Sequence, residues 1–479
     1  MDHYKDIRKS KHENWIKRNS GIAYLDKFEK NTNCISAVAL EENSENINLA
    51  GRIVLFRKMG KIAFLKLKDF SGLFQVVLDK EVLGEDFDFF CDNLDLGDII
   101  GVKGTIFITK KGEKSLKAQS VELLSKNYIP LPEKWHGLTD KEARLRKRYV
   151  DLIVNDESAN VFKFRSDFIK NLRRFMESYD FVEVETPILQ AQASGALANP
   201  FKTHHNDMHM DLFLRIAPET YLKRLMAGGY ERIFEIGKSF RNEGSDPSHL
   251  QEFTMMEFYC AYWNFEDAIN FVKNVFSDLI EKLNIPETIE YAGQKINLSM
   301  PWKVISYKDL FKQYTKLDLD YLLKNEEEFF EVAKSFVDVS KYKSIPSLID
   351  GIYKKHCRPN LIDPCIITHQ PSALGPLARV SDSDPLYSDR FQLVINGWEV
   401  VNAYSELINF EAQRKTLEKQ QDLRDKGEEE SMEMEEDFLE AMEFGMPPMA
   451  GVGIGIDRLI ALFTNSESLR EVVFFPNLK

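Results

Sequence analysis

The segment FQLVINGWEVVNAYSEL, residues 391–407, constrains the fold more than any other short stretch of this sequence. Its two apolar runs are separated only by Asn396-Gly397, a pair that favours a type I′ β-hairpin because both turn positions need positive φ. The resulting register predicts that residue 394 pairs with 399 and residue 392 with 401. Gln392 and Glu399 then lie diagonally on one face of the sheet, as a pair that could hold a metal ion. The alternative is that Glu399 is an ordinary exposed strand residue.

The second run of this hairpin carries three more polar groups, Asn402, Tyr404 and Glu406. Strict alternation places Glu399 on the opposite face of the strand from all three. If both groups serve one pocket, a bulge must therefore intervene near residues 400–402.

The chain is long enough for two or three structural units, since domains usually hold about 100–200 residues. No apolar run approaches the roughly 20 residues that cross a membrane, and MDHYKDIRKSKHENWIKR lacks the apolar core of a secretory signal. The five cysteines form no CxxC pair, which favours a reducing compartment and argues against structural zinc. We therefore expect a cytoplasmic protein without membrane association.

A change of pattern near residue 47 indicates an α+β chain with an N-terminal β-barrel. Five β-rich runs, INLAGRIVLF, KIAFLKLKDF, LFQVVL, DIIGVKGTIFI and SLKAQSVELL, with a helix expected at 81–94 after the third, fit an OB-type barrel. Such barrels commonly bind single-stranded nucleic acid. The predicted organisation is an N-terminal helical extension at 1–46, the barrel at 47–126, a linker at 127–148 and a larger domain at 149–479.

The net charge of -13 is unusual for a nucleic-acid-binding protein, because Lys and Arg contacts with phosphates supply most non-specific affinity. Much of the acid lies in DKGEEESMEMEEDFLE, residues 425–440, whereas RLRKR at 144–148 is basic. Local basic patches on an acidic chain are compatible with RNA binding. Taken singly, each charged run is better explained as a solvated helix face.

The stretch ERIFEIGKSFRNEGSDPSHLQEFTMMEFYCAY, residues 231–262, holds two strand-like runs joined by a polar connection. Phe253, Glu257 and Tyr259 share one face of the second run by the period of two. A carboxylate among aromatics is costly to bury unless it meets a cation. Arg241, at the end of the first run, is suited to phosphate because its planar fork donates two hydrogen bonds. An ion-paired hairpin would explain any two of these residues but not the set.

A second constellation, PPMAGVGIGIDRLIALFTNS at 447–466, alternates Gly451, Gly453 and Gly455 along a strand. One face of this strand has no side chains, so a flat ligand such as a purine could lie against the backbone. The spacing is not the GxGxxG of dinucleotide-binding folds. Alternating glycines alone more often mean tight strand packing. With Arg458 at the following turn and Arg241 on the other hairpin, they suggest a nucleotide held between two arginines.

In these segments the chain resembles the class II aminoacyl-tRNA synthetases. The helix before FVEVETPIL is similar to their motif 1, FRNEG with EFTMMEFYCAY to motif 2, and AGVGIGIDRL to motif 3. The order of FKTHHND, LFLRIAPETYLKRLMAGGYERIFEIGKSFRNEG and YSEL, behind the barrel and HGLTDKEARLRKRYVDLI, resembles the lysyl-tRNA synthetases over nearly the whole chain.

The resemblance implies an antiparallel sheet flanked by helices, a homodimer through motif 1, and the substrates ATP, L-lysine and lysine tRNA, with Mg²⁺ as cofactor. It assigns ATP binding to Arg241, Glu243, His249, Phe253, Glu399, Gly455 and Arg458, of which Arg241, Arg458 and Glu399 are catalytic. It assigns lysine binding to Gly195, Glu219, Glu257, Tyr259, Asn402, Tyr404 and Glu406. The implied anticodon readers are Arg57, Phe64, Gln75 and Glu113, and the implied metal ligands are Glu399 and Gln392.

Several positions depart from the family pattern. Gln392 stands where the family usually has a second magnesium-binding glutamate, so we expect a raised magnesium requirement. The other departures are Trp398, Asn199, Ser194, Leu250-Gln251 and Ile408-Asn409. Two alternatives remain beside an active synthetase: a lysyl ligase acting on a protein such as elongation factor P, which the N-terminal barrel disfavours, and a catalytically weakened tRNA-binding or regulatory paralogue.

Overall fold

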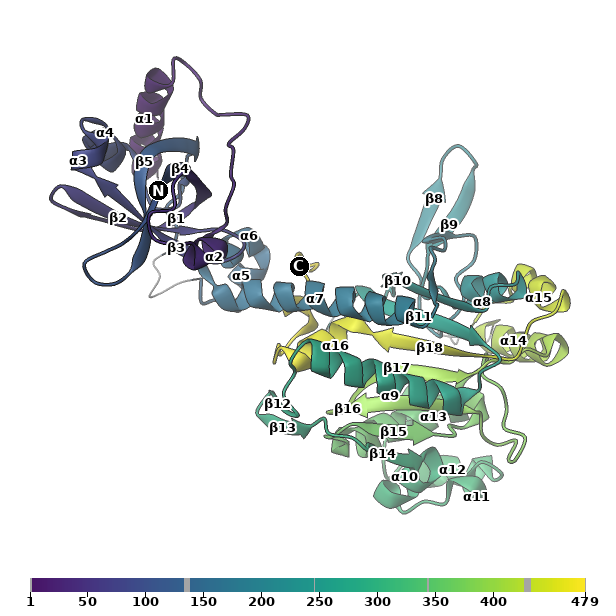
Figure 1. The fold of residues 1–479 in the computed structure, drawn as a ribbon. Coiled ribbons are helices and arrows are strands. Elements are labelled where there is room, and N and C mark those ends of the chain that lie inside the picture. Colours follow the sequence, from purple (N-terminus) through teal and green to yellow (C-terminus); the bar gives the residue numbers. More distant parts are fainter. Residues whose placement is uncertain (1, 133–137, 245, 343, 426–431, 479) are drawn as a thin grey trace. The chain divides into compact units, whose positions relative to one another are not determined.

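The computed structural model describes residues 2–132, 138–244, 246–342, 344–425 and 432–478. The chain divides into two compact units, Met1–Asp140 and Lys141–Lys479. The elements of both are labelled in Figure 1. No helix in the described ranges is both long enough and apolar enough to cross a membrane.

The first unit is built on a closed five-stranded barrel with the strand order β1-β2-β3-β5-β4, as the β-rich runs predicted. The strands are β1 (Ile47–Met59), β2 (Ile62–Lys68), β3 (Leu73–Asp79), β4 (Ile99–Ile108) and β5 (Lys114–Ser125). Side chains alternate between the interior and the surface of the barrel. On β2, Ala63, Leu65 and Leu67 are fully buried, and Phe64 and Lys66 between them are partly exposed. The pairing of β3 with β5 is parallel and the others are antiparallel.

Helices cover parts of this barrel. The predicted single helix at 81–94 is wrong in detail: α3 (Lys80–Leu83) ends at Gly84, whose φ of 58° breaks the helix, and α4 (Asp86–Asn93) follows. The N-terminal α1 (Asp2–Arg18) packs Trp15 into the barrel core, stacked on Phe90 with ring centroids 5.6 Å apart. The short α2 (Cys34–Ala39) also belongs to this unit.

The second unit is built around an eight-stranded sheet with the order β14-β15-β16-β17-β18-β11-β10-β6. Its pairings are antiparallel except for the outermost pair on each side, β14–β15 and β10–β6. These strands are β6 (Val182–Glu183), β10 (Arg232–Phe240), β11 (Glu252–Ala261), β14 (Lys303–Ser306), β15 (Cys365–Thr368), β16 (Arg390–Ile395), β17 (Trp398–Ser405) and β18 (Met449–Gly455). Of the segment FVEVETPIL, only Val182 and Glu183 join this sheet, as β6.

Helices and small sheets surround this central sheet (Figure 1). The helices of the unit are α5 (Lys141–Arg146), α6 (Arg148–Val154), α7 (Asp156–Ser178), α8 (Glu219–Ala227), α9 (Phe265–Lys282), α10 (Tyr307–Thr315), α11 (Leu319–Leu322), α12 (Glu326–Ala333), α13 (Ile345–Ile352), α14 (Phe410–Asp425), α15 (Glu436–Glu443) and α16 (Ile456–Phe463). The smaller sheets pair β12 (Thr288–Tyr291) with β13 (Gln294–Asn297), and β7 (Leu189–Gln190) with β9 (Met210–Leu214) and β8 (Lys202–His205).

The two faces of the central sheet differ in chemistry. Apolar residues on one face, among them Phe258, Ala403 and Val452, form the main core with α7, α9 and α16. Because strand side chains alternate, their neighbours Glu257, Tyr404 and the alternating glycines of β18 lie on the opposite face. One face therefore stabilises the unit, and the other is free to bind a ligand.

The Asn396-Gly397 hairpin forms as predicted, with φ of 48° and 70° at its two turn residues. Val394 pairs with Glu399, but the predicted pairing of residue 392 with 401 is wrong: Gln392 pairs with Asn402. Val400 and Val401 both enter the main core, each 1% exposed. This bulge shifts the alternation by one residue, so that Glu399 and Asn402 face the same side of the sheet.

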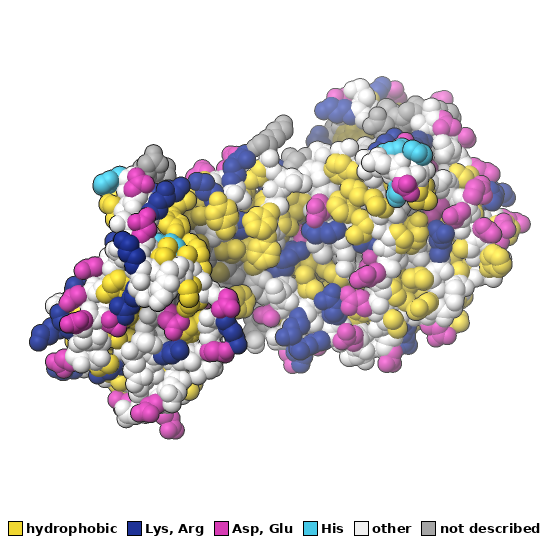
Figure 2. Space-filling view, turned by 90° about the horizontal axis from the view of Figure 1, so that it is seen from above, with side chains coloured by type: hydrophobic (Ala, Val, Ile, Leu, Met, Phe, Trp, Pro, Cys, Tyr) yellow, Lys and Arg dark blue, Asp and Glu magenta, His cyan; other side chains and the backbone are white. Residues whose placement is uncertain are grey.

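Charged side chains of both signs are interspersed over the face of the protein in Figure 2. The net charge of -13 is therefore not expressed there as a uniformly acidic surface. Since local charge decides where an anionic partner can bind, the acidic total does not exclude one.

Candidate active site

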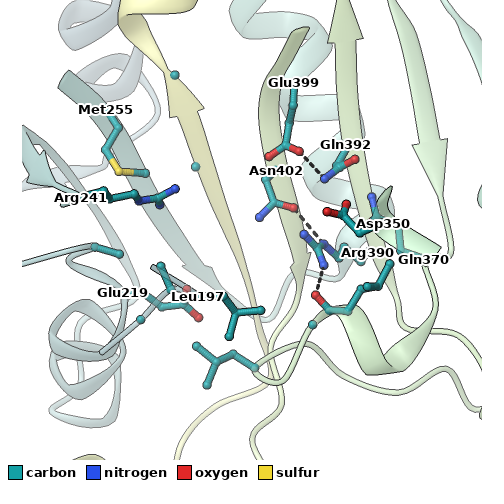
Figure 3. Close-up of a pocket in the computed structure, with 18 of the residues that line it drawn as sticks. Leu197, Glu219, Arg241, Met255, Asp350, Gln370, Arg390, Gln392, Glu399 and Asn402 are labelled. Atoms are coloured by element: carbon teal, nitrogen blue, oxygen red, sulfur yellow. Dashed lines mark hydrogen bonds between the residues drawn. The ribbon is translucent and has the colours of Figure 1, made fainter. Parts of the chain in front are cut away.

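A cavity of about 1090 Å³ opens on the polar face of the central sheet. Its walls include β11, β17 and β18 together with the start of α8, and Figure 3 shows several of its residues. All of the predicted ATP-binding and lysine-binding residues line this one cavity, and so does Gln392. The structure thus brings together residues from five distant segments. The sequence patterns alone had grouped only Arg241, Arg458 and the alternating glycines, and the family resemblance supplied the rest.

The three alternating glycines form the floor of the cavity. Gly451 lies between Tyr259 and Tyr404 on the neighbouring strands, and Gly453 lies between Glu257 and Asn402. A Cβ on Gly451 would lie 2.1 Å from Glu406 Oε1 and 2.5 Å from the Tyr259 ring. The missing side chain at Gly451 therefore makes room for protein groups of the site.

Three buried carboxylates gather at one end of the cavity: Glu219 from α8, Glu257 from β11 and Glu406, the residue directly after β17. The Tyr404 hydroxyl donates to Glu219 Oε1 at 2.6 Å, and the Tyr259 hydroxyl donates to Glu257 Oε2 at 3.1 Å. Lys223, fully buried one turn after Glu219, pairs with both Glu219 and Glu406. This end of the cavity therefore holds three acidic groups against one lysine.

Burial raises the pKa values of two of these acids, Glu257 and Glu406. Burial and then the charge of Glu219 raise the pKa of Glu257 to about 8. Burial also raises the pKa of Glu406 well above its ordinary range, although Lys223 opposes that shift. Burial lowers the pKa of Lys223, but Glu219 and Glu406 together more than reverse this effect. A cationic ligand would relieve the unfavourable burial of these carboxylates.

Cationic groups occupy another part of the cavity. Arg458 Nη1 donates to the backbone carbonyl of Glu399 at 2.7 Å, and its Nη2 lies 3.5 Å from His249 Nε2. The Arg241 guanidinium lies over the Phe253 ring, 5.1 Å from its centroid. Such arginines can donate bidentately to phosphate oxygens. Glu243 and His249 are exposed at the edge of the cavity.

Arg458 is positioned by the residue before it. The buried Asp457 accepts from Arg165 of α7 at 2.6 Å and from the backbone N–H of Thr254 at 2.7 Å. Arg165 also donates to Thr254 Oγ1 at 2.9 Å. This network ties the first turn of α16 to β11 and α7, and thereby fixes the place from which Arg458 reaches the cavity.

Gln392 and Glu399 are in direct contact, as their predicted diagonal placement required. Gln392 Nε2 donates to Glu399 Oε2 at 2.5 Å (Figure 3). Gln392 Oε1 accepts from the Tyr353 hydroxyl at 3.4 Å. Within the described ranges, no group of three or more His, Cys, Asp and Glu side chains could hold a metal ion. A magnesium ion usually takes one or two carboxylates and completes its ligands with substrate phosphates and water. Glu399 fits the role of a single carboxylate ligand.

Two cavity residues, Arg390 and Asp350, and the underlying Lys223 escaped the sequence prediction. Arg390 Nε donates to Asn402 Oδ1 at 2.9 Å and so orients that amide. Glu219 and Lys223 are four residues apart, and this spacing in the sequence was a signal that they form an ion pair on a helix. Asp350 comes from α13, outside every motif, and nothing in the sequence pointed to it.

The four predicted anticodon readers belong to the first unit and share one face of its barrel. Arg57 pairs with Phe64 across β1 and β2, and Lys66 pairs with Gln75 across β2 and β3. Glu113 reaches the same face, where its Oε1 lies 3.4 Å from Lys66 Nζ. Phe64 is half-exposed, whereas Gln75 is buried and donates to Ser115 Oγ at 2.9 Å.

Comparison with known proteins agrees with this architecture. Residues 140–479 match the family described as tRNA synthetases class II (D, K and N), and residues 47–124 match the OB-fold nucleic acid binding domain. The chain belongs to the class II tRNA synthetases.

The similar curated proteins have a more specific name. The lysine-tRNA ligase of Aquifex aeolicus (strain VF5) is 45% identical over 443 residues, which cover 92% of this chain and 74% of that protein. The lysine-tRNA ligases of Legionella pneumophila (strain Lens) and Prochlorococcus marinus (strain MIT 9312) are 44% and 43% identical. Those matches cover 92% of this chain and 89% and 88% of the respective relatives.

Proposed function

We propose that this chain activates L-lysine with ATP to form lysyl-adenylate and then transfers the lysyl group to the 3′ end of lysine tRNA. The observation that carries the proposal is the polarity of the cavity. Three buried carboxylates line one end and two arginines another part of it, which suits a cationic amino acid beside a nucleotide. The names of the similar proteins point to the same reaction.

At the cationic part of the cavity, we assign Arg241 to the α-phosphate of ATP, and Arg458 and His249 to the outer phosphates. Phe253 would stack on the adenine ring and Glu243 would accept from its amino group. The carboxylate of lysine attacks the α-phosphorus in line, the bond to the bridging oxygen breaks, and pyrophosphate leaves. The reaction needs no protein nucleophile, so this chain contributes positioning and charge stabilisation.

At the anionic end, Glu219, Glu257 and Glu406 would pair with the ammonium groups of lysine. Tyr259, Asn402, Tyr404 and Gly195 complete the proposed lysine site. Each charge-assisted hydrogen bond of this kind contributes about 1.5–3 kcal/mol. A neutral amino acid would leave the carboxylates unpaired, and sites built on such polar pairing reject analogues by about 10⁴- to 10⁵-fold. Arginine has to be excluded by the length of the pocket.

Glu399 is the residue that would hold Mg²⁺ in this chain. When bound, the metal ion supplies positive charge to the phosphate oxygens. Gln392 cannot act as a second anionic ligand, because it offers only a neutral carbonyl. We therefore expect an active enzyme whose need for magnesium is raised.

For the barrel, we propose that Arg57, Phe64, Gln75 and Glu113 read the anticodon of lysine tRNA. The half-exposed Phe64 offers a stacking surface, and Gln75 and Glu113 can hydrogen-bond to base edges. With these substrates, we expect the protein to act in the cytoplasm.

Charging of lysine tRNA with labelled lysine tests the proposal against its alternatives. We expect ATP-dependent formation of lysyl-tRNA and no lysylation of elongation factor P under the same conditions. A chain that lysylates the protein but not the tRNA would be the ligase instead. A chain that binds lysine tRNA without charging it would be the regulatory paralogue.

A further inference from the structure

Lys223 lies behind the proposed lysine site and is not among the residues that line the cavity. Its side chain is fully buried on α8. The Nζ atom is 2.7 Å from Glu219 Oε1, pairs with Glu406 Oε2, and lies 5.6 Å from the centroid of the Tyr404 ring. Lys223 therefore holds one positive charge against two of the three acids, Glu219 and Glu406.

Each acid keeps one oxygen available to the cavity. Both Lys223 and the Tyr404 hydroxyl bind Glu219 through Oε1, so Oε2 accepts no hydrogen bond from the described residues. Tyr259 occupies only Oε2 of Glu257. Glu406 Oε1 is buried without a hydrogen-bond partner in the described part of the chain. A buried acceptor in that state calls for a donor from a ligand.

We propose that Lys223 is a positioning residue that sets the charge of the lysine site: against three carboxylates it leaves two negative charges, which match the two ammonium groups of a diamino acid. This inference rests on the proposed function. Without a built-in cation, three ionised carboxylates around a ligand carrying two positive charges would leave one buried charge unpaired, which is strongly unfavourable.

The arrangement couples lysine binding to protons. Glu257, with its pKa near 8, is largely protonated at neutral pH. The groups facing it are Glu219 and Lys223 from α8, Glu235 from β10, Glu406 after β17, and Tyr259 on its own strand. An ammonium group binds the ionised carboxylate better, so lysine binding releases a proton and tightens as pH rises from about 7 to 8.5. The ε-ammonium, with a pKa of about 10.4, stays charged over that range.

Replacement of Lys223 by methionine keeps the size of the side chain and removes its charge. We expect the lysine KM at pH 7 to rise roughly 100-fold, as when one partner of a buried charge pair is lost, while the ATP KM changes less than threefold. This increase in the lysine KM should shrink as pH rises. Without Lys223 the neighbouring acids retain protons that lysine must displace, and they lose these protons at higher pH. K223R, which keeps the charge, should recover most of the affinity.

Arg224 provides the matched control. It is the next residue on the same helix, but its guanidinium pairs with Glu435 and Asp437 rather than with the three acids. R224M should therefore leave the lysine KM and its pH dependence unchanged. Thermal unfolding of each variant shows whether it is folded.

The readout is ATP-pyrophosphate exchange at varied lysine concentration and pH. A folded K223M protein with a lysine KM within threefold of the unaltered value, or with an increase that does not depend on pH, would overturn the inference. If K223M does not fold, the unaltered protein is tested with two compounds that compete with lysine for its site in the exchange assay. 1,5-diaminopentane, which carries two ammonium groups, should inhibit more strongly than 6-aminohexanoate, which carries one. The reverse order would contradict the charge count. Failure of the proposed function would look different, because the unaltered protein would then show no lysine-dependent exchange.

Discussion

Gln392 shows how one residue can change the chemistry of a site without changing its fold. Its amide bridges two groups, donating to Glu399 and accepting from Tyr353. A glutamate there would place two carboxylates side by side, which is favourable only when a cation lies between them. In this chain the Gln392 amide instead donates a hydrogen bond that holds the Glu399 carboxylate.

Replacement of Gln392 by glutamate should lower the magnesium concentration that gives half-maximal ATP-pyrophosphate exchange several-fold. The added carboxylate supplies the anionic oxygen that a hard divalent cation prefers. Q392A is the matched variant, because it also removes the hydrogen bond to Glu399 but adds no charge. An unchanged magnesium dependence in Q392E would disprove a metal role for this position.

At the scale of elements, the glycine-rich strand β18 sets the depth of the cavity. Gly451 and Gly453 stand at equivalent places along it, but their surroundings differ. A Cβ at position 451 meets a carboxylate oxygen at 2.1 Å, whereas one at 453 first meets the flexible end of Met255 at 3.4 Å. The strand is therefore more tightly restricted beside the acids than beside Met255.

Gly451→Ala should raise the lysine KM at least tenfold, because Glu406 and the Tyr259 ring would have to move. Gly453→Ala should have a clearly smaller effect on the same constant. The lysine KM of both variants is measured by steady-state exchange kinetics, with lysine varied at saturating ATP. Equal effects of the two substitutions would mean that close approach at Gly451 does not shape the lysine site.

The β16–β17 hairpin marks the limit of what the sequence could predict. Local turn chemistry fixed the Asn396-Gly397 turn and the first pair, Val394 with Glu399. A bulge near residues 400–402 was predicted only on the condition that Glu399 and Asn402 serve one pocket, and the structure has it at Val400. The local sequence does not mark the bulge, because it arises from burying Val400 and Val401 together in the core under the sheet. Lys223 shows the same limit: its spacing to Glu219 was visible, but its contact with Glu406 depends on how the chain folds.

At the scale of the whole molecule, the barrel and the catalytic unit perform separable tasks in the proposed function. Phe64→Ala should weaken charging of lysine tRNA, because stacking of one base contributes about 1–3 kcal/mol. It should leave ATP-pyrophosphate exchange with lysine unchanged, since that reaction needs no tRNA. The KM for tRNA in the charging assay measures the first effect, and the rate of ATP-pyrophosphate exchange measures the second. An equal loss in the two assays would argue against an anticodon role.

We also propose that the chain forms a homodimer through the motif 1 region. Val182 of the edge strand β6 is 50% exposed, and the nearby Ile188 and Leu189 are 45% and 50% exposed. An apolar group at an open sheet edge is typical of an interface. Light scattering should give twice the chain mass of 55.5 kDa. A particle of single mass at micromolar concentration would contradict the proposal.

The central claim is that the acidic end of the cavity selects lysine for activation by ATP. ATP-pyrophosphate exchange with each of the twenty amino acids in turn tests it most directly. We expect strong exchange with lysine, and with the neutral amino acids a rate lower by about 10⁴-fold or more. Exchange that is absent with lysine, or stronger with any other amino acid, would contradict it.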